Sequence, residues 1–298
     1  MQITIVTVNY NGSESTLELL RSLEEQTNKD FQTIVVDNAS EEADFTTLQA
    51  NISKFNFHIS TVRNSENLGF SGGNNNGIRQ ALDPSTRSGQ ETGPEWVIFL
   101  NNDTWVESSF VEHLKAKLSG LEGIVGIPLV EGDKVAYCGK VQWLKSTLKH
   151  VYQKFTINLL PTTYYIIGGG MAVHKDVFNK IGFLDEKYFL YFEDADFSVR
   201  ARKAKIPISI QYDIMIYHTV SASTKKLGSS LLLRYHYRNA LYFNLKNGPW
   251  YIKLLVWPWS WVIIVKQLVK LAMRKNVDQS RAILAGVMNF YQNKYGKI

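Results

Sequence analysis

The 298-residue sequence contains a single cysteine, Cys138, and few of the residues that mark unusual compositions. One cysteine excludes an intramolecular disulfide and most cysteine-based metal sites. Seven prolines and twenty glycines exclude a low-complexity or collagen-like chain, and 45% hydrophobic residues exclude a disordered one. This cysteine usage is compatible with a reducing compartment but does not establish one, because many exported proteins also lack disulfides. The length favours about two domains, or one large α/β domain with an appendage.

The sequence also lacks a leader and a long hydrophobic run. Met1 and Gln2 lead directly into an apolar stretch, without the positive charges that begin a signal peptide. The longest apolar stretch covers residues 254–265, is interrupted by Pro258 and Ser260, and is too short to span a bilayer. We therefore expect a protein that is not exported and is not a polytopic membrane protein. Its expected location is the cytoplasm.

Acidic residues are nearly absent from the last quarter of the chain. Residues 225–298 carry 13 Lys and Arg and one acid, Asp278, whereas residues 1–224 carry 20 basic and 26 acidic residues. The net charge of +6 therefore combines an acidic body with a strongly basic tail. Such a division indicates an anionic partner for the tail, either a membrane surface or a nucleic acid; the alternative is an ordinary solvated surface.

Strand and helix patterns alternate over the first part of the chain. Apolar runs predict strands at residues 3–8, 32–36, 57–62 and 96–100. Helices are predicted over residues 13–26, after residue 37, and over residues 72–82 and 106–118. Continuous apolar strands that alternate with helices predict a mostly parallel sheet covered on both faces. Residues 83–95 predict an exposed loop, and residues 131–165 show no clear pattern.

Polar side chains stand where the predicted strands end. Asn9, Asp37 and Asp103 follow three of these strands, and ligands of open α/β sheets bind beyond such ends. Asp103 could hold a divalent cation that neutralises a diphosphate, or it could cap the helix that follows. His218 follows a later apolar strand and could complete a metal site with Asp103 and phosphate oxygens.

Three acids in four residues, Glu193, Asp194 and Asp196, follow the aromatic run at 188–192. Aromatic rings desolvate neighbouring carboxylates, which raises the pKa of a carboxylate and makes it a better base. The alternative is a solvated helix start that pairs with Arg200 and Arg202. The aromatic run favours a catalytic function over full solvation.

A glycine- and asparagine-rich segment at residues 67–77 is similar to a phosphate loop, but glycine alone is a weak signal. The Rossmann dinucleotide pattern belongs after the first strand, where only Gly12 is found. A nicotinamide-dependent dehydrogenase is therefore disfavoured.

Taken in order, these segments resemble one family over about residues 2–245. They are VTVNYNG, VVDNAS, NLGFSGGNNNGI, FLNNDT and GGGMAVHKDVFNKIGFLDEKYFLYFEDADFSVRARKAK, followed by His218. They resemble family 2 glycosyltransferases, most closely the rhamnosyltransferase-like subgroup that assembles surface polysaccharides. The resemblance implies an α/β GT-A fold. In it a Rossmann-like nucleotide-binding half (1–104) is fused to an acceptor-binding half (105–228) around a central, mostly parallel sheet.

The resemblance also assigns roles to individual residues. Nucleotide-sugar binding is implied for Thr7, Asn9, Asp37, Asn67, Gly72, Asn76, Asn102 and Gly169, with Asp37 at the pyrimidine edge. Asp103 and His218 would bind Mg²⁺ or Mn²⁺. Asp194, in its pair with Glu193, would be the general base. The first acid of the family's D-x-D motif is Asn101 here. This leaves one carboxylate at the metal and predicts low metal affinity without the nucleotide.

The implied activity is an inverting, metal-dependent transfer of a sugar to a saccharide or lipid-linked acceptor. L-Rhamnose from a deoxythymidine-diphosphate (dTDP) donor is the first choice of sugar. The alternatives are a UDP-hexose donor and a non-catalytic nucleotide-sugar-binding protein. A nucleic-acid partner is disfavoured, because the positive charge is confined to a tail that also carries a tryptophan-rich apolar run.

The tail at residues 229–298 predicts a helical membrane anchor. Trp250, Trp257, Trp259 and Trp261 are four of the seven tryptophans. Lys266, Lys270 and Arg274 recur at a spacing of four, opposite Val265, Leu268, Val269 and Ala272. A basic amphipathic helix with an aromatic collar is typical of an interfacial anchor. We therefore expect peripheral association with the inner face of the plasma membrane; the alternative is a helix docked on the catalytic body.

Overall fold

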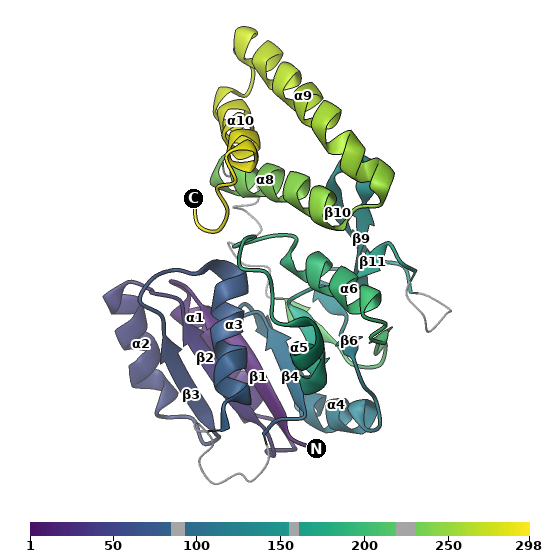
Figure 1. The fold of residues 1–298 in the computed structure, drawn as a ribbon. Coiled ribbons are helices and arrows are strands. Elements are labelled where there is room, and N and C mark those ends of the chain that lie inside the picture. Colours follow the sequence, from purple (N-terminus) through teal and green to yellow (C-terminus); the bar gives the residue numbers. More distant parts are fainter. Residues whose placement is uncertain (85–92, 155–160, 219–229) are drawn as a thin grey trace.

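A computed structural model describes residues 1–84, 93–154, 161–218 and 230–298 (Figure 1). The loop predicted at residues 83–95 lies mostly outside the described residues. A central sheet of seven strands has the order β13-β6-β12-β4-β1-β2-β3. Its strands are β1 (Ile3–Asn9), β2 (Gln32–Asp37), β3 (Ile59–Arg63), β4 (Trp96–Leu100), β6 (Ile124–Gly126), β12 (Gly170–His174) and β13 (Ile208–Ile210).

The direction of the strands divides this sheet into two parts. β1, β2, β3 and β4 are all parallel, as the alternating pattern predicts. β12 runs antiparallel to both β4 and β6, and β13 is parallel to β6. The sheet is therefore mixed, and its parallel part carries the strand ends at Asn9 and Asp37.

Helices cover both faces of the sheet. They are α1 (Ser13–Glu24), α2 (Glu42–Ile52), α3 (Gly69–Leu82), α4 (Phe110–Leu118), α5 (Lys175–Ile181) and α6 (Glu193–Lys203). Leucines of α1 and α4 pack with Ile3, Ile5 and Ile98 on one face. Side chains of α3, α5 and α6 pack with Val6, Val97 and Phe99 on the other. The continuous apolar strands are thus buried on both sides, as parallel strands generally are.

Two small sheets include the region that showed no clear pattern in the sequence, residues 131–165, together with short strands before and after it. One has the order β5-β14-β7-β8 and the other β10-β9-β11. Their strands are β5 (Thr104–Trp105), β7 (Leu129–Glu131), β8 (Lys134–Ala136), β9 (Cys138–Gln142), β10 (Thr147–Val151), β11 (Tyr164–Tyr165) and β14 (Ile216–His218), with a 3₁₀ turn, η2 (Trp143–Lys145). The apolar strand predicted before His218 is β14; the other strands have two to five residues, which is too short to give a hydrophobic period, and the sequence did not reveal them.

The tail forms three helices: α8 (Ser230–Asn247), α9 (Trp250–Ala272) and α10 (Val277–Tyr291). α8 lies on the body, where Phe243 stacks on Trp143 with ring centres 5.2 Å apart. α9 and α10 project away from the body above α8 (Figure 1). Leu241, Val256 and Val287 belong to a core that these three helices share. The tail therefore has a core of its own and is also joined to the body through α8.

The expectation that the apolar stretch of the tail is too short to span a bilayer is not met by α9. The helix continues through Pro258 for 23 residues and is long and apolar enough to cross a membrane. At 1.5 Å per residue its length is about 34 Å, against about 30 Å for a hydrocarbon core.

The polarity of α9 also differs from the predicted division into a lysine face and an apolar face. Its buried stripe contains two polar residues, Ser260 and Gln267, beside Ile252, Val256 and Ile263. Ser260 Oγ lies 2.6 Å from the Tyr291 hydroxyl, and Gln267 accepts a hydrogen bond from Ser280 at 3.1 Å. Large apolar side chains point outward instead: Trp250, Leu254, Trp261, Val265, Leu268 and Val269 are each more than half exposed.

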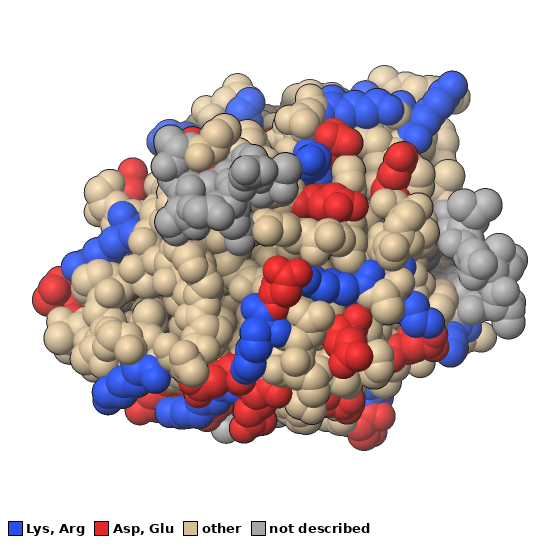
Figure 2. Space-filling view, turned by 90° about the horizontal axis from the view of Figure 1, so that it is seen from below, with Lys and Arg blue, Asp and Glu red and all other residues tan. Residues whose placement is uncertain are grey.

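Charges of both signs are interspersed on the face of the body opposite the tail (Figure 2). On the part of this face that the structure describes, neither sign forms a large patch. The basic excess of the chain therefore belongs to the tail and not to this face.

Candidate active site

A cavity of about 290 Å³ opens at the carboxyl ends of β1 and β4 and at the start of α3. We call it the strand-end cavity. Its lining includes Asn38, Asn67, Asn101, Asn102 and Asp103. Parallel strands end at the same edge of a sheet, which brings together side chains that are far apart in the sequence. Of the predicted binding residues, Asn67 and Asn102 line this cavity directly, as does the predicted metal ligand Asp103.

The glycines of the segment at residues 67–77 serve helix packing. A Cβ atom on Gly73 would lie 2.8 Å from Val8 Cγ1, and one on Gly77 would lie 2.4 Å from Val6 Cγ1. A Cβ on Gly72 would lie 2.6 Å from Leu68 Cβ. Gly73 and Gly77 let α3 approach β1 closely, and Gly72 leaves room for Leu68 just before the helix, so most of the segment is helix and not a phosphate loop. Gly72 does not line the cavity.

Several predicted binding residues form a buried layer beneath the cavity. Asn9 donates hydrogen bonds to Asp37 Oδ1 at 3.1 Å and to Asp44 Oδ2 at 2.9 Å, and it accepts one from Thr16. Asp37 is 1% exposed. Thr7 is buried, and its hydroxyl has no hydrogen-bond partner in the described part of the chain. Contact of these side chains with a nucleoside stays a prediction; in the structure they support the cavity wall.

Two further predicted binding residues are held by side-chain contacts. Asn76 donates to Asn64 Oδ1 at 2.7 Å, and Asn102 donates to Thr16 Oγ1 at 3.1 Å. The Asn102 bond ties the turn after β4 to the first turn of α1. The backbone of Gly169 lies so close to Asn101 that a Cβ atom would be 2.6 Å from Asn101 Nδ2. The triple-glycine segment and the Asn101–Asp103 turn are therefore in contact.

Asp103 and His218 are brought together at the rim of the strand-end cavity. His218 Nε2 lies 3.3 Å from Asp103 Oδ1, and the side chains are 15% and 14% exposed. The antiparallel pairing of β14 with β5 aligns His218 with Thr104, which follows Asp103. One carboxylate and one imidazole suit a divalent ion such as Mn²⁺ that takes its other ligands from phosphate and water. Among the described residues, no group of three or more His, Cys, Asp or Glu could hold a metal by itself.

The aromatic run before the acids forms a strained loop. Phe189, Tyr191 and Phe192 have φ angles of 63°, 71° and 77°, which bulky residues rarely adopt. Asn239 of α8 donates hydrogen bonds to the carbonyls of Tyr188 and Leu190 at 2.8 and 2.7 Å. Such strain persists only where surrounding contacts over-determine the backbone. The loop is thus held in place from α8, which the sequence did not suggest.

Asp194 and Glu193 line a second cavity, of about 410 Å³, on the other side of this loop. We call it the carboxylate cavity. Asp194 Oδ2 accepts a hydrogen bond from the Gly168 amide at 3.1 Å, and burial raises the pKa of the Asp194 carboxyl. Glu193 is 6% exposed, and its Oε2 has no hydrogen-bond partner within the described residues. Burial and the neighbouring charge of Asp194 raise the pKa of Glu193 well above its usual range.

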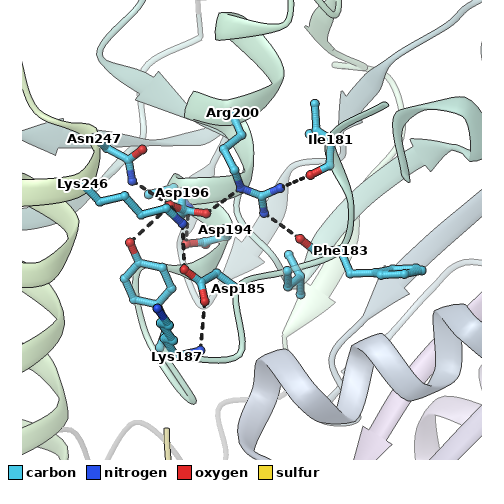
Figure 3. A network of polar contacts seen from close by, with 12 residues as sticks. Ile181, Phe183, Asp185, Lys187, Asp194, Asp196, Arg200, Lys246 and Asn247 are labelled. Carbon is cyan, nitrogen blue, oxygen red and sulfur yellow. Dashed lines mark hydrogen bonds and ion pairs between the residues drawn. The ribbon is translucent and has the colours of Figure 1, made fainter. Parts of the chain in front are cut away.

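The third acid, Asp196, belongs to a structural network (Figure 3). It is fully buried, and it pairs with Arg200 and with Lys246, each at 2.7 Å. Asn247 donates a further hydrogen bond to it at 2.7 Å. These contacts join α6 to the end of α8. Because both carboxylate oxygens are engaged in these contacts, Asp196 is not available to take a proton, which leaves Asp194 and Glu193 as the acids of this segment that face a cavity.

One polar pair near Asp194 had no signal in the sequence. His150 of β10 lies 3.1 Å from Glu131 of β7. Burial alone would lower the pKa of His150, but the hydrogen bond and the charge of Glu131 outweigh burial and raise it. His150 lines the carboxylate cavity, and Glu131 is aligned with His218 across β7 and β14. The pair therefore connects the Asp103–His218 rim with the cavity that holds Asp194.

Ligands of open α/β sheets bind at the carboxyl ends of the parallel strands, where the strand-end cavity lies. The Asp103–His218 pair at its rim and the buried carboxylates across the loop supply groups suited to binding a metal and to moving a proton, as in an enzyme that transfers a group between two substrates. The family model for glycosyl transferase family 2 matches residues 4–182, so the chain belongs to this family and is a glycosyltransferase.

Curated relatives agree with this assignment. The chain is 24% identical to the low-salt glycan biosynthesis hexosyltransferase Agl10 of Haloferax volcanii, over 99% of this chain and 92% of the relative. It is 27% identical to the dTDP-rhamnosyl transferase RfbF of Shigella flexneri, over 59% and 62%. It is 22% identical to the N-acetylglucosaminyl-diphospho-decaprenol L-rhamnosyltransferase of Mycobacterium tuberculosis, over 86% and 88%.

Solved structures confirm the predicted GT-A fold. The mannosyltransferase PcManGT from Pyrobaculum calidifontis, solved with GDP-Man and Mn²⁺, superposes with a TM-score of 0.56 at 15% identity. That match covers 98% of this chain and 87% of PcManGT. The chain spans only 40% of the larger S. aureus TarS and 48% of GalNAc-T7, which are also similar in fold.

Proposed function

We propose that this enzyme is an inverting, metal-dependent glycosyltransferase of surface-polysaccharide synthesis that moves L-rhamnose from a dTDP donor to a saccharide or lipid-linked acceptor. One observation carries the proposed transfer: the strand-end cavity and the carboxylate cavity flank the same loop. Phe189 and Leu190 line the first cavity, and Tyr191 and Phe192 line the second. A donor in the strand-end cavity and an acceptor in the carboxylate cavity would therefore meet at this loop.

Asp194 is the proposed general base. Its carboxylate would take the proton of the acceptor hydroxyl while that oxygen forms a bond to the anomeric carbon and the bond to the diphosphate breaks. A single displacement inverts the configuration at this carbon. The Gly168 amide donates a hydrogen bond that holds the Asp194 carboxylate in place. Burial raises the pKa of this carboxyl, which makes Asp194 a stronger base. Glu193, buried beside it with one unpartnered oxygen, is placed to bind a second acceptor hydroxyl.

Asp103 and His218 would hold Mg²⁺ or Mn²⁺ together with the donor diphosphate. When bound, the ion supplies positive charge that stabilises the leaving diphosphate. Asn101 replaces the first acid of the motif, so the diphosphate itself must supply much of the charge that retains the ion.

The donor is tested by thermal stabilisation with a panel of nucleotide sugars and Mn²⁺. We expect dTDP-L-rhamnose, at about one hundred times its Kd, to raise Tm by about 4 °C, because it binds only the native state. The relatives named as rhamnosyltransferases support this choice, and dTDP alone and a GDP-sugar serve as controls. A larger shift with UDP-hexoses would favour the alternative donor. No shift with any nucleotide sugar would contradict the donor site.

We further propose that α9 places the enzyme on the inner face of the plasma membrane. Its outward face is apolar, and the exposed Lys266 on the helix and Arg274 and Lys275 directly after it add positive charge. Burial of apolar side chains and attraction to anionic lipid would act together.

Flotation with anionic vesicles tests this location. Binding should fall in high salt without vanishing, since salt screens only the charges. The double substitution W261E/L268E, on exposed positions, should lower vesicle binding about a hundredfold or more without unfolding the protein. Salt-sensitive retention on DNA with no binding to vesicles would contradict the proposal and support a nucleic-acid partner.

A further inference from the structure

The strained loop at residues 188–192 lies between the strand-end cavity and the carboxylate cavity, and the start of α3 holds it from one side. The amide of Phe70 donates a hydrogen bond to the Phe189 carbonyl at 2.7 Å. A Cβ atom on Gly69 would lie 2.3 Å from the same carbonyl oxygen, so the loop and the helix are in direct contact. Phe189 and Leu190 line the strand-end cavity. The contact with α3 therefore fixes the part of the loop that faces the proposed donor.

Two neighbouring residues of α8, Arg238 and Asn239, hold the loop from the other side, and both are fully buried. The Asn239 amide donates hydrogen bonds to three loop carbonyls, those of Tyr188, Leu190 and Tyr191, at 2.8, 2.7 and 3.1 Å. Nη2 of Arg238 donates to the carbonyls of Lys187 and Tyr188 at 3.1 and 2.9 Å. These bonds engage the backbone of the loop in the segment where φ angles are positive.

The same arginine also binds the last residues of the sequence. Nη1 of Arg238 donates to the carbonyl of Gly296 at 2.7 Å and to that of Lys294 at 3.3 Å. The amide of Gly296 donates in turn to the carbonyl of Lys187 at 2.9 Å. Residues 294–298, here called the C-terminal strap, therefore lie against the start of the loop, and Arg238 joins the two segments.

The charge of Arg238 is balanced by uncharged oxygens. Within the described residues its hydrogen bonds go to the four carbonyls of the loop and the strap and to Asn239 Oδ1, at 2.9 Å. Burial lowers the pKa of Arg238 to about 10, so the guanidinium is charged at neutral pH. A buried donor that loses its partner keeps the desolvation penalty without the hydrogen bond, and this penalty is larger for a charged group. The loop, the strap and α8 therefore form one unit.

The position of this unit bears directly on the proposed base. Phe192, the last residue of the loop, is the N-cap of α6, and Asp194 lies in the first turn of that helix. Tyr191 and Phe192 also line the carboxylate cavity. A shift of this end of the loop would therefore move both Asp194 and the wall of the proposed acceptor site, while the contact of Phe189 with α3 would keep the donor side in place.

We infer that Arg238, Asn239 and the C-terminal strap are positioning elements of the transfer reaction. They hold the acceptor side of the loop, and they thereby set the alignment of Asp194 and the acceptor with the donor. The inference rests on the proposed function, because the loop is where donor and acceptor would meet. If the same contacts only attached the tail to the body, their loss would lower Tm without changing kcat.

The first test compares two buried asparagines of α8, with a soluble acceptor so that membrane attachment is not required. Asn239→Ala removes the bonds to the loop, whereas Asn244→Ala removes bonds to Trp143 O and Ser146 Oγ, at 3.2 and 2.8 Å, outside the loop. We expect Asn239→Ala to lower kcat about a hundredfold, because a displacement of about 1 Å at the reacting groups costs that much. The Kd of the nucleotide sugar should not change. Asn244→Ala should lower Tm but leave kcat unchanged.

The second test asks whether Arg238 and the strap act as one unit. Ending the chain after Asn293 should lower kcat about tenfold or more. Arg238→Lys should do the same, because an ammonium group cannot reproduce the planar fork that binds both segments. The two changes combined should cost no more than the larger of them alone, since they break the same connection. The control K270A/R281A removes two tail cations outside the strap, as many as the truncation does, and should leave kcat unchanged.

Amide hydrogen exchange of the loop gives a readout that does not depend on activity. With the nucleotide sugar bound, residues 188–192 should exchange faster in Asn239→Ala and in the shortened chain than in the wild type and in Asn244→Ala. Unchanged exchange, or an unchanged kcat in Asn239→Ala and Arg238→Lys despite a lower Tm, would overturn the inference and leave the proposed function intact. Faster exchange in a protein whose wild type transfers no sugar would overturn the proposed function, and the contacts would then be structural only.

Discussion

Replacing Asp194 by Asn is expected to lower kcat about 10²–10⁴-fold, the range typical of general acid–base catalysis. The amide keeps the shape of the side chain but cannot accept the proton of the acceptor hydroxyl. Asp194 lies outside the strand-end cavity, so the affinity for the nucleotide sugar should remain unchanged. The measurement is initial-rate kinetics of transfer, paired with donor binding by calorimetry.

The pH profile adds a second readout for Asp194. A base must be ionised, and burial raises the pKa of this carboxyl. Transfer should therefore fall as pH decreases through a midpoint above that of an ordinary aspartate. The Asn variant should lose this limb of the profile.

Glu193→Gln is the matched control for the base. It changes the neighbouring carboxylate, which lines the same cavity, and should mainly raise KM for the acceptor. Near-normal turnover by Asp194→Asn, with a collapse in Glu193→Gln, would move the base to Glu193. Asp196 is excluded from this role by its ion pairs with Arg200 and Lys246.

Removing the metal or its carboxylate ligand is the second change with a large expected effect. EDTA should abolish transfer, and Asp103→Ala should lower it by about a thousandfold or more even at high Mn²⁺, since several kcal/mol of leaving-group stabilisation are lost. His218→Ala should cost less, because imidazole is neutral and a water molecule can take its place. Activity against Mn²⁺ concentration, measured for each variant, separates weaker metal binding from lost catalysis.

Asn101→Asp provides a gain-of-function control. It restores the first acid of the motif, and it should lower the Mn²⁺ concentration needed for half-maximal activity, because charge count sets much of the affinity. Full activity in EDTA would instead indicate a metal-independent enzyme. Two cations that could then replace the metal are already engaged: Arg238 donates to backbone carbonyls of Lys187 and Tyr188, and Arg234 donates to Asn289.

The parallel half of the fold could be predicted from sequence because its strands are continuous apolar runs. The same pattern placed Asp103 and His218 after predicted strands and suggested them as one metal site, and the two side chains lie 3.3 Å apart in the structure. The glycines after Asn67 look like a phosphate loop in the sequence, but the structure gives a different reason for Gly73 and Gly77. A side chain at either position would prevent the close approach of α3 to β1. A glycine required for packing and one required for a ligand look the same in a sequence.

Long-range contacts explain most of what the sequence could not predict. Glu131 and His150 come from short strands of different sheets, and neither belongs to a motif. Asn239 holds the strained loop from a helix about fifty positions away. The buried stripe of α9 includes Ser260 and Gln267 beside three apolar residues, while large apolar side chains such as Trp261 are exposed, so polarity alone does not show which face of this helix is buried.

The central claim is that the two cavities together catalyse sugar transfer with Asp194 as base. The most direct measurement follows radiolabelled L-rhamnose from its dTDP donor into a lipid-extractable product, with Mn²⁺ and a lipid fraction that contains diphosphate-linked saccharides. The account predicts transfer by the wild-type enzyme, loss of transfer in EDTA, and loss in Asp194→Asn with donor binding retained. A wild-type protein that binds the nucleotide sugars of the panel but leaves all of them intact would contradict it and indicate a non-catalytic nucleotide-sugar-binding protein.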